Sequence, residues 1–132
     1  MKVAAVTEDG TTISQHFGRA PKVLVVVVEN GKIVDRLLRE KAGHDQFAGD
    51  PHPEHASGGG HGKGPMAGSR HARMIEAFAD CEALLCGGMG QGAYEAVKAR
   101  GIRPFVTEIE LIDEAVQAYV DGSLVDRIER LH

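Results

Sequence analysis

Residues 23–39, VLVVVVENGKIVDRLLR, decide the fold class of this chain. The run opens with six aliphatic residues, Val23–Val28, and the last four of these are β-branched, which favours a strand buried on both faces over a piece of buried helix. Asn30 and Gly31 then supply the two positive-φ residues of a type I′ turn. This turn predicts that residues 33–39 return as an antiparallel strand, so that the run forms a β-hairpin.

Strands and helices alternate in the sequence after the hairpin, and one apolar strand precedes it at 2–7. A hairpin followed by βα steps predicts an α/β fold: a five-stranded mixed sheet with one antiparallel strand and helices on both faces. Pro104 places the last strand at the sheet edge, because proline cannot donate to a ladder. The later elements are expected to be a helix from Ser69 to about Ala79, strands at 83–86 and 103–106, and helices at 93–100 and 109–120.

The expected topology places the first and fourth strands side by side at the centre of the sheet, with the chain running outward from this pair in both directions. Such a switch point leaves a crevice beyond the carboxyl ends of the strands, where α/β proteins bind ligands. Residues 14–21, SQHFGRAP, follow the first strand, and residues 86–93, CGGMGQGA, follow the fourth. We therefore expect both segments to lie at one crevice.

The two segments combine groups that suit an anion of metal and sulfide. The glycine turn opens a helix, whose free N–H groups and positive dipole end favour an anion, and its glycines allow close approach to the backbone. His16 offers a metal-binding imidazole, Arg19 a positive charge, and Cys86 and Met89 soft sulfur donors. Each of three residues also has a structural interpretation: His16 as a loop histidine bonded to a carbonyl, Cys86 as a core thiol, and Met89 as a plug that fills the turn.

These segments resemble a known family. Residues 14–20, a His-rich insertion and residues 87–93 are together similar to the dinitrogenase iron–molybdenum cofactor-binding family. The resemblance implies a ribonuclease H-like domain without nuclease chemistry, which binds an iron–sulfur or iron–molybdenum-type cluster, or its precursor, during cofactor assembly or transfer. It assigns the cluster-associated histidine to His16. The expected cofactor-binding residues are His16, Phe17, Gly18, Arg19, Gly87, Gly88, Met89, Gly90 and Gly92, and the candidate metal ligands are His16 and Cys86.

The chain is therefore expected to be a non-catalytic carrier and not an enzyme. Its cluster would be bound transiently and absent from the purified apo protein, and its expected partners are proteins that donate or accept the cluster. The main alternative is a nucleotide-binding α/β protein, because residues 88–93 also match the Gly-x-Gly-x-x-Ala pattern, with Glu108 and Glu110 downstream. A full dinucleotide fold continues through several more βα units, whereas only one strand follows this turn.

Residues 43–69, the His-rich insertion, differ in composition from the rest of the chain. They hold eight of the 17 glycines, three prolines and four histidines, which are His44, His52, His55 and His61. Such a segment cannot bury enough apolar surface to offset its ordering entropy, which predicts a mobile loop within a single domain of residues 1–132. The histidines match no closed zinc-site spacing. A solvated linker is the favoured interpretation, and a divalent-metal buffer is the alternative.

The remaining composition argues against several functions. With 15 basic and 19 acidic residues the net charge is −4, which gives no basic field for nucleic acid, and Trp is absent, which argues against a base-stacking surface. Residues 1–7 are too few for a signal peptide or a membrane span, so a cytoplasmic protein with no membrane partner is expected. From Thr107 onward, seven acids stand against two arginines. A solvated acidic face is the favoured interpretation of this stretch, and a docking face for a basic partner is the alternative.

Overall fold

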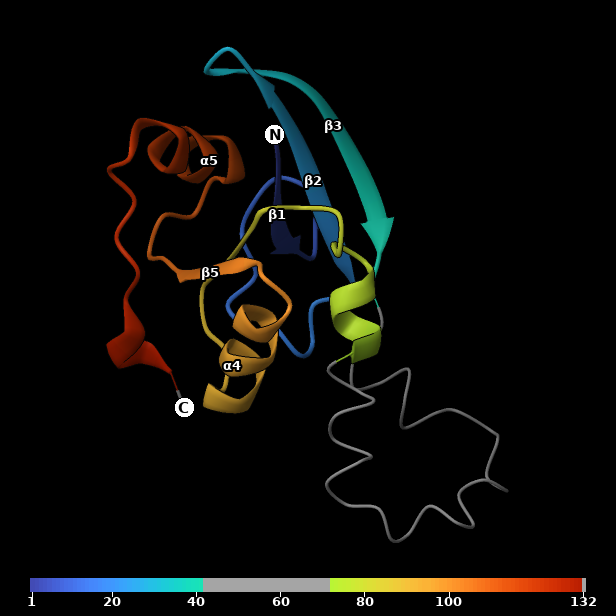
Figure 1. The fold of residues 1–132 in the computed structure, drawn as a ribbon. Helices are drawn as coiled ribbons and strands as arrows, with labels where there is room; N and C mark the ends of the chain where they lie inside the picture. Colours follow the sequence, from blue (N-terminus) through green and yellow to red (C-terminus); the bar gives the residue numbers. More distant parts are fainter. Residues whose placement is uncertain (42–71, 132) are drawn as a thin grey trace, which may run out of the picture.

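The computed structural model describes residues 1–41 and 72–131. In this part of the chain, five strands form one sheet and helices pack against it (Figure 1). None of these helices is long and apolar enough to cross a membrane. The strands are β1 (Lys2–Thr7), β2 (Lys22–Glu29), β3 (Lys32–Glu40), β4 (Ala83–Cys86) and β5 (Arg103–Val106). The helices are a short one at 72–76, α4 (Gln91–Ala99), α5 (Ile112–Asp121) and the 3₁₀ helix η1 (Ile128–Arg130).

The sheet has the strand order β3-β2-β1-β4-β5. β2 runs antiparallel to both of its neighbours, whereas β1, β4 and β5 are parallel to one another. The prediction of a mixed sheet with one antiparallel strand is therefore confirmed. The hairpin turn is also the predicted one, since both of its residues have positive φ angles, 55° at Asn30 and 77° at Gly31. Because β1 and β4 are neighbours, the predicted switch point lies between them.

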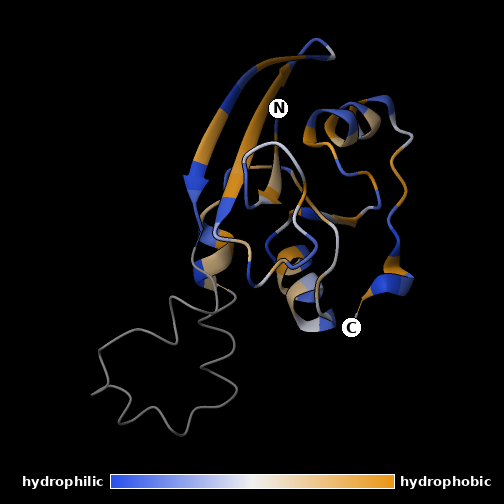
Figure 2. Cartoon of the chain, turned by 180° about the vertical axis from the view of Figure 1, so that it is seen from behind, coloured by the Kyte–Doolittle hydropathy of each residue, from blue (hydrophilic) through white to orange (hydrophobic). Residues whose placement is uncertain are grey.

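Helices cover both faces of the sheet, as predicted. On one face, α4 and the helix at 72–76 join a core cluster with alternate residues of β1, β2 and β4, and on the other face α5 does the same with the intervening residues. This alternation follows from the period of two in a strand. Figure 2 shows β2 as hydrophobic along most of its length, whereas β3 is a mixture. β2 is thus a doubly covered strand, and β3 is an edge strand with exposed side chains.

Long-range contacts explain where the observed helices differ from the predicted ones. α5 begins at Ile112 and not at Ile109, because the backbone of 110–112 is bonded to the loop after β1: Ile13 N–H donates to Glu110 C=O at 2.8 Å, and Ile112 N–H donates to Thr11 C=O at 3.0 Å. The helix before β4 ends at 76 and continues as a turn. Its predicted N-cap and the insertion at 43–69 lie outside the described residues. Pro104 lies in the edge strand β5, as predicted.

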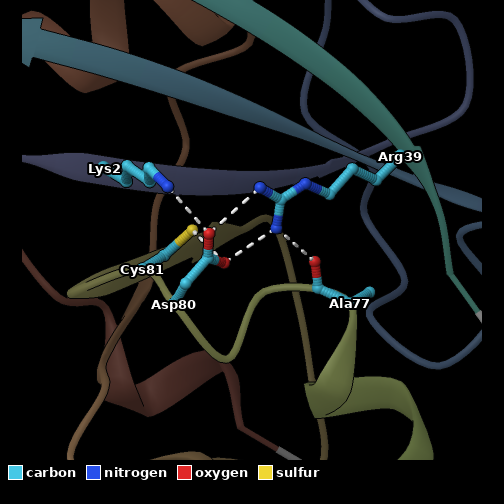
Figure 3. Close-up of polar contacts among 5 residues, drawn as sticks. All are labelled: Lys2, Arg39, Ala77, Asp80 and Cys81. Atoms are coloured by element: carbon cyan, nitrogen blue, oxygen red, sulfur yellow. Dashed lines mark hydrogen bonds and ion pairs between the residues drawn. The ribbon is translucent and has the colours of Figure 1, made fainter.

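A cluster of ion pairs ties the edge strand β3 to the connection before β4 (Figure 3). The Arg39 guanidinium donates to both carboxylate oxygens of Asp80, at 2.7 and 3.0 Å, and to the carbonyl of Ala77 at 3.1 Å. Lys2 of β1 donates to the same carboxylate at 3.0 Å. The hydrogen bonds from Arg39 are the main reason that the pKa of Asp80 lies well below its usual range. The connection that follows the 72–76 helix is thereby held against the sheet.

Candidate functional site

A pocket of about 480 Å³ lies beyond the carboxyl ends of β1 and β4. It brings together side chains and backbone from the two segments that the topology predicted to meet, although His16 and the glycine turn are more than 70 residues apart in the sequence. The residues that line it are His16, Phe17, Gly18, Arg19, Met74, Gly88, Met89, Gly90, Gln91, Gly92 and Ala93. Among the described residues, only Met74, from the 72–76 helix, lines the pocket from outside these two segments. Met74 gave no signal in the sequence beyond its apolar helix face.

Backbone hydrogen bonds hold the two segments together. Gly87 N–H donates to Ser14 C=O at 2.8 Å, and Phe17 N–H donates to Gly88 C=O at 3.0 Å. Ser14 N–H is in turn bonded to Val6 C=O of β1, at 2.8 Å. The loop that carries His16 is thus attached both to β1 and to the glycine turn. These bonds depend on no side chain, so substitutions of the pocket side chains leave the junction itself in place.

His16 projects from a tight turn and is exposed. Its carbonyl accepts the N–H groups of Arg19 and Ala20, at 3.2 and 3.0 Å, and its own N–H donates to Ser14 Oγ at 3.1 Å. Within the described residues, the imidazole ring of His16 and the guanidinium of Arg19 make no hydrogen bond or ion pair. The structural interpretation of His16, a ring bonded to a backbone carbonyl, therefore does not hold here. Both side chains are available to a ligand in the pocket.

Phe17 anchors this turn in the core. Its ring is 2% exposed and meets Phe78 edge-to-face, with centroids 6.1 Å apart. The Nζ atom of Lys41 lies 5.0 Å from the centre of the same ring and donates to Ala20 C=O at 3.0 Å. Burial lowers the pKa of Lys41 to about 8. Sequence reasoning missed Lys41, because nothing in its neighbourhood distinguishes it from the exposed charges of a strand end.

The glycine turn ends at the first turn of α4. Gly90 is the N-cap, with no side-chain cap, and the first turn has no acidic residue. In the part of the chain that the structure describes, none of the N–H groups from Met89 to Ala93 donates a hydrogen bond. These groups and the helix dipole together favour an anion at this point of the pocket. Gly90 has a φ of −78°, which any residue adopts, so the backbone conformation at this position does not require glycine.

Gly87 lies behind the pocket and is covered by a side chain that the sequence did not single out. A Cβ atom at Gly87 would lie 2.6 Å from Gln15 Nε2, which is too close for contact. Arg130 of η1 donates to Gln15 Oε1 at 3.4 Å and to Glu108 at 3.3 Å. Glycine at this position therefore allows the Gln15 side chain to pack on the backbone and reach the C-terminal segment.

The two sulfur residues of the glycine segment have different positions. Met89 is 1% exposed and lines the pocket, so it forms part of the pocket wall as well as of the core. Cys86 is fully buried and does not line the pocket, and burial raises the pKa of its thiol to about 12. Because the thiolate is the form that binds metal, this environment fits the interpretation of Cys86 as a core thiol. Its role as a metal ligand stays a prediction.

The described residues of the pocket do not form a chelating set for a bare metal ion. Among residues 1–41 and 72–131, no three His, Cys, Asp or Glu side chains are grouped closely enough to hold one. The pocket instead offers a single imidazole, one guanidinium and several backbone N–H groups. This donor set suits an anion that brings most of its own ligands.

Comparisons with known proteins identify the family. The chain matches the family model described as dinitrogenase iron-molybdenum cofactor over residues 1–122. It is 29% identical over 124 residues to an uncharacterized protein of Methanocaldococcus jannaschii, a match that covers 94% of this chain and 89% of that protein. It is 32% identical over 132 residues to the FeMo cofactor biosynthesis protein NifB of Frankia alni, a match that covers 95% of this chain but only 22% of NifB.

The fold is also similar to that of a solved structure, the apo form of the orange protein from Desulfovibrio gigas. The TM-score is 0.64, and the sequences are 19% identical over 93% of this chain and 89% of that one. At this level of identity, the likeness concerns the fold alone. The family match spans nearly the whole chain, including both segments that form the pocket, and agrees with the resemblance seen in the sequence. The chain belongs to the dinitrogenase iron–molybdenum cofactor family.

Proposed function

We propose that this protein is a non-catalytic carrier that binds an iron–sulfur or iron–molybdenum-type cluster, or a precursor of one, during cofactor assembly or transfer. The observation that carries the proposal is the pocket: an imidazole, a guanidinium and a run of free N–H groups surround one space of about 480 Å³. That volume lies within the range of about 300–1,000 Å³ typical of ligand pockets. Membership of the cofactor family supports a metal-cluster cargo.

Each pocket residue has a role in this proposal. The His16 imidazole binds a metal at the surface of the cluster, and Arg19 and the N–H groups at the start of α4 stabilise its negative charge. Gly88, Gly90 and Gly92 let bulky sulfides approach the backbone, and Gly87 lets Gln15 pack behind the turn. Phe17 and Gly18 shape the turn that presents His16, and Met89 forms an apolar wall.

The single imidazole favours a cluster that arrives already assembled. Iron–sulfur clusters that reside permanently in proteins are usually held by several cysteine thiolates. Among the described residues, the lining includes no cysteine, so these residues would hold the cargo by charge, shape and one ligand. Such binding is readily reversible, which suits transfer between a donor and an acceptor protein. It would also allow the cluster to dissociate during purification.

A nucleotide is the second candidate ligand, and one observation favours it. The Gly-x-Gly-x-x-Ala turn lies between β4 and α4, and Glu108 follows the next parallel strand, β5, which is the context that a dinucleotide site requires. However, Glu108 and Glu110 do not line the pocket, and Glu108 is paired with Arg130. The pocket extends toward His16 instead. We therefore favour the cluster over the nucleotide.

Anaerobic reconstitution with iron, sulfide and molybdate tests the proposal. After removal of unbound metal by gel filtration, the wild-type chain should retain iron or molybdenum with sulfide in a defined ratio and show visible absorption. His16→Ala should retain about tenfold less metal, because it loses the one side-chain ligand of the pocket. Arg19→Gln should weaken retention less, because it removes charge but no ligand. Addition of NAD⁺ or ATP in place of the metals should produce no saturable binding.

Two control variants make this result specific. Arg100→Gln removes an exposed positive charge at the end of α4, remote from the pocket lining, and should retain as much metal as the wild type. The double variant His52→Ala/His55→Ala removes two histidines of the insertion and tests the metal-buffer alternative. Full retention in His16→Ala, or a loss in the double variant equal to that in His16→Ala, would contradict the assignment of His16 as the ligand.

A cytoplasmic location fits a chain whose two cysteines are both buried free thiols. The ribonuclease H-like relationship implied by the resemblance stays a prediction, and nuclease chemistry has no part in the proposal. Neither nucleic acid nor membrane is proposed as a partner.

A further inference from the structure

A small apolar groove opens on the α5 side of the molecule, on the opposite face of the sheet from the cluster pocket. We name it the α5-side groove; its volume is about 210 Å³ and its walls include Gly10, Leu24, Arg36, Leu111 and Asp113. Leu24 and the adjacent Ile112 are 7% and 1% exposed and form an apolar floor. The volume is below the roughly 300–1,000 Å³ of small-molecule pockets and suits an inserted side chain of another protein.

Two large leucines stand exposed beside the groove. Leu111 is 44% exposed and lines it, and Leu38 of β3 is 53% exposed. Leu38 Cδ1 would lie 3.9 Å from a Cβ atom at Gly10, which places it against the groove wall. On the other side, Arg36 donates to both carboxylate oxygens of Asp113, at 3.1 and 2.7 Å, and fixes the wall between β3 and α5. An exposed apolar rim around a rigid depression is typical of a protein-docking site.

The surroundings of the groove are acidic. Asp9, Glu110 and Glu114 are exposed and adjoin lining residues in the sequence. Backbone hydrogen bonds from Thr12 and Thr11 lower the pKa of Asp9 to about 2, so it is charged at neutral pH. The cations of this region have acidic neighbours: Arg36 pairs with Asp113, and Lys22 lies in register opposite Glu40. A basic partner is therefore attracted here, and a second copy of this acidic face is repelled.

We propose that the α5-side groove docks a protein partner whose contact segment places one large apolar side chain between lysine or arginine residues. The loop after β1 connects this groove to the cluster pocket, since Gly10 and Thr11 line the groove and residues 16–19 line the pocket. A partner bound at the groove would contact the loop that presents His16. That this partner donates or accepts the cluster rests on the proposed function, whereas the docking itself does not.

Peptide selection on the intact protein tests the docking. A display library of random 12-residue peptides is selected against the full chain, and enriched peptides are measured by fluorescence anisotropy. We expect an apolar residue flanked by Lys or Arg, and binding that weakens about three- to tenfold between 0.1 and 0.5 M NaCl. Leu111→Ser should weaken binding about tenfold by removing the apolar rim. This variant keeps the fold, because Leu111 is the N-cap of α5, where serine is preferred.

Matched variants on another surface provide the controls. Ile128 is 57% exposed on η1, so Ile128→Ser removes a comparable apolar side chain and should change peptide affinity less than twofold. Glu110→Lys should weaken binding, whereas Glu129→Lys should not. Selected peptides that lack basic residues, or equal losses in Leu111→Ser and Ile128→Ser, would overturn the proposal.

A photo-crosslinker distinguishes the occupants of the groove. With p-benzoylphenylalanine at position 38, irradiation with a selected peptide should give a peptide adduct. An adduct within the chain or between two copies, formed in preference to the peptide adduct, would assign the groove to this protein itself and overturn the proposal. The reconstitution experiment remains independent, since Leu111→Ser should retain as much metal as the wild type. Loss of peptide binding without loss of metal thus tests docking alone, and absence of metal in the wild type tests the cargo alone.

Discussion

Replacing Asp80 with asparagine tests the ion pairs that hold the connection before β4 against the sheet. The Asp80 carboxylate accepts two hydrogen bonds from Arg39 and one from Lys2, and it joins β3, β1 and the connection before β4 (Figure 3). The side chains of Asp80, Lys2 and Arg39 are 43%, 41% and 31% exposed, so solvent screens each pair. An exposed pair contributes about 0–1 kcal/mol, and a two-pronged pair with a second cation lies at or above the upper end. We expect Asp80→Asn to lower the free energy of unfolding by about 1–1.5 kcal/mol.

Denaturation by urea, followed by circular dichroism, measures this loss, and Glu76→Gln is the control. Glu76 is exposed on the 72–76 helix, and its side chain makes no hydrogen bond or ion pair within the described residues. Because the pKa of Asp80 is lowered by folding, its contribution is present above the unfolded pKa and is lost as the pH falls through the folded one. The difference between wild type and Asp80→Asn should therefore be constant above about pH 5 and shrink in acid, and 0.5 M salt should reduce it. A loss no larger than that of Glu76→Gln, or one that neither salt nor acid changes, would refute the reasoning.

Met89 of the pocket wall, two glycines and the buried Lys41 provide three further tests. Met89→Ala should lower the free energy of unfolding by about 2–4 kcal/mol, because Met89 is 1% exposed in the core; urea denaturation measures this loss. In the same assay, Gly31→Ala should lower the free energy of unfolding by about 1 kcal/mol, because Gly31 has a φ of 77°. Gly90→Ala should lower it less, because Gly90 has a φ of −78°, and its main effect should be on metal retention. Burial lowers the pKa of Lys41 from 10.5 to about 8, so between these values the unfolded chain holds a proton that the folded chain has lost. The cysteine and tyrosine residues titrate in both the wild type and Lys41→Met, so their effects cancel in the difference between the two proteins. The free energy of unfolding of the wild type, relative to Lys41→Met, should therefore rise with pH across that window.

The sheet could be predicted from the sequence because its strongest signals are local. Asn30 and Gly31 specify a turn whose geometry fixes the pairing of β2 with β3, and this pairing needs no distant contact. Pro104 restricts β5 to the sheet edge by its own chemistry. The predicted start of α5 is three residues too early, because two backbone hydrogen bonds to residues 11 and 13 hold the preceding segment outside the helix. No periodicity within 109–120 contains that information.

For the candidate site, the sequence predicted which backbone segments meet but not which contacts their side chains make. Topology brought His16 to the glycine turn, and the buried strand before the turn indicated a core position for Cys86. Neither signal showed that the imidazole of His16 has no bonding partner among the described residues. The contacts of Lys41 with Phe17 and Ala20 also join segments that are distant in the sequence. In each case the missing information is the direction of one side chain, which packing decides after the strands are placed.

The backbone sets the shape of this pocket, whereas exposed side chains supply the groups that would select a ligand. The hydrogen bonds that join the two loops run from Gly87 to Ser14 and from Phe17 to Gly88, and all four of the groups involved belong to the main chain. The free N–H groups at the start of α4, where we propose that the anion binds, are likewise independent of side-chain identity. His16 and Arg19 are exposed and make no side-chain contact that the described fold depends on. Substitution at these two positions should therefore alter which anion is held and how tightly, while the crevice that receives it persists.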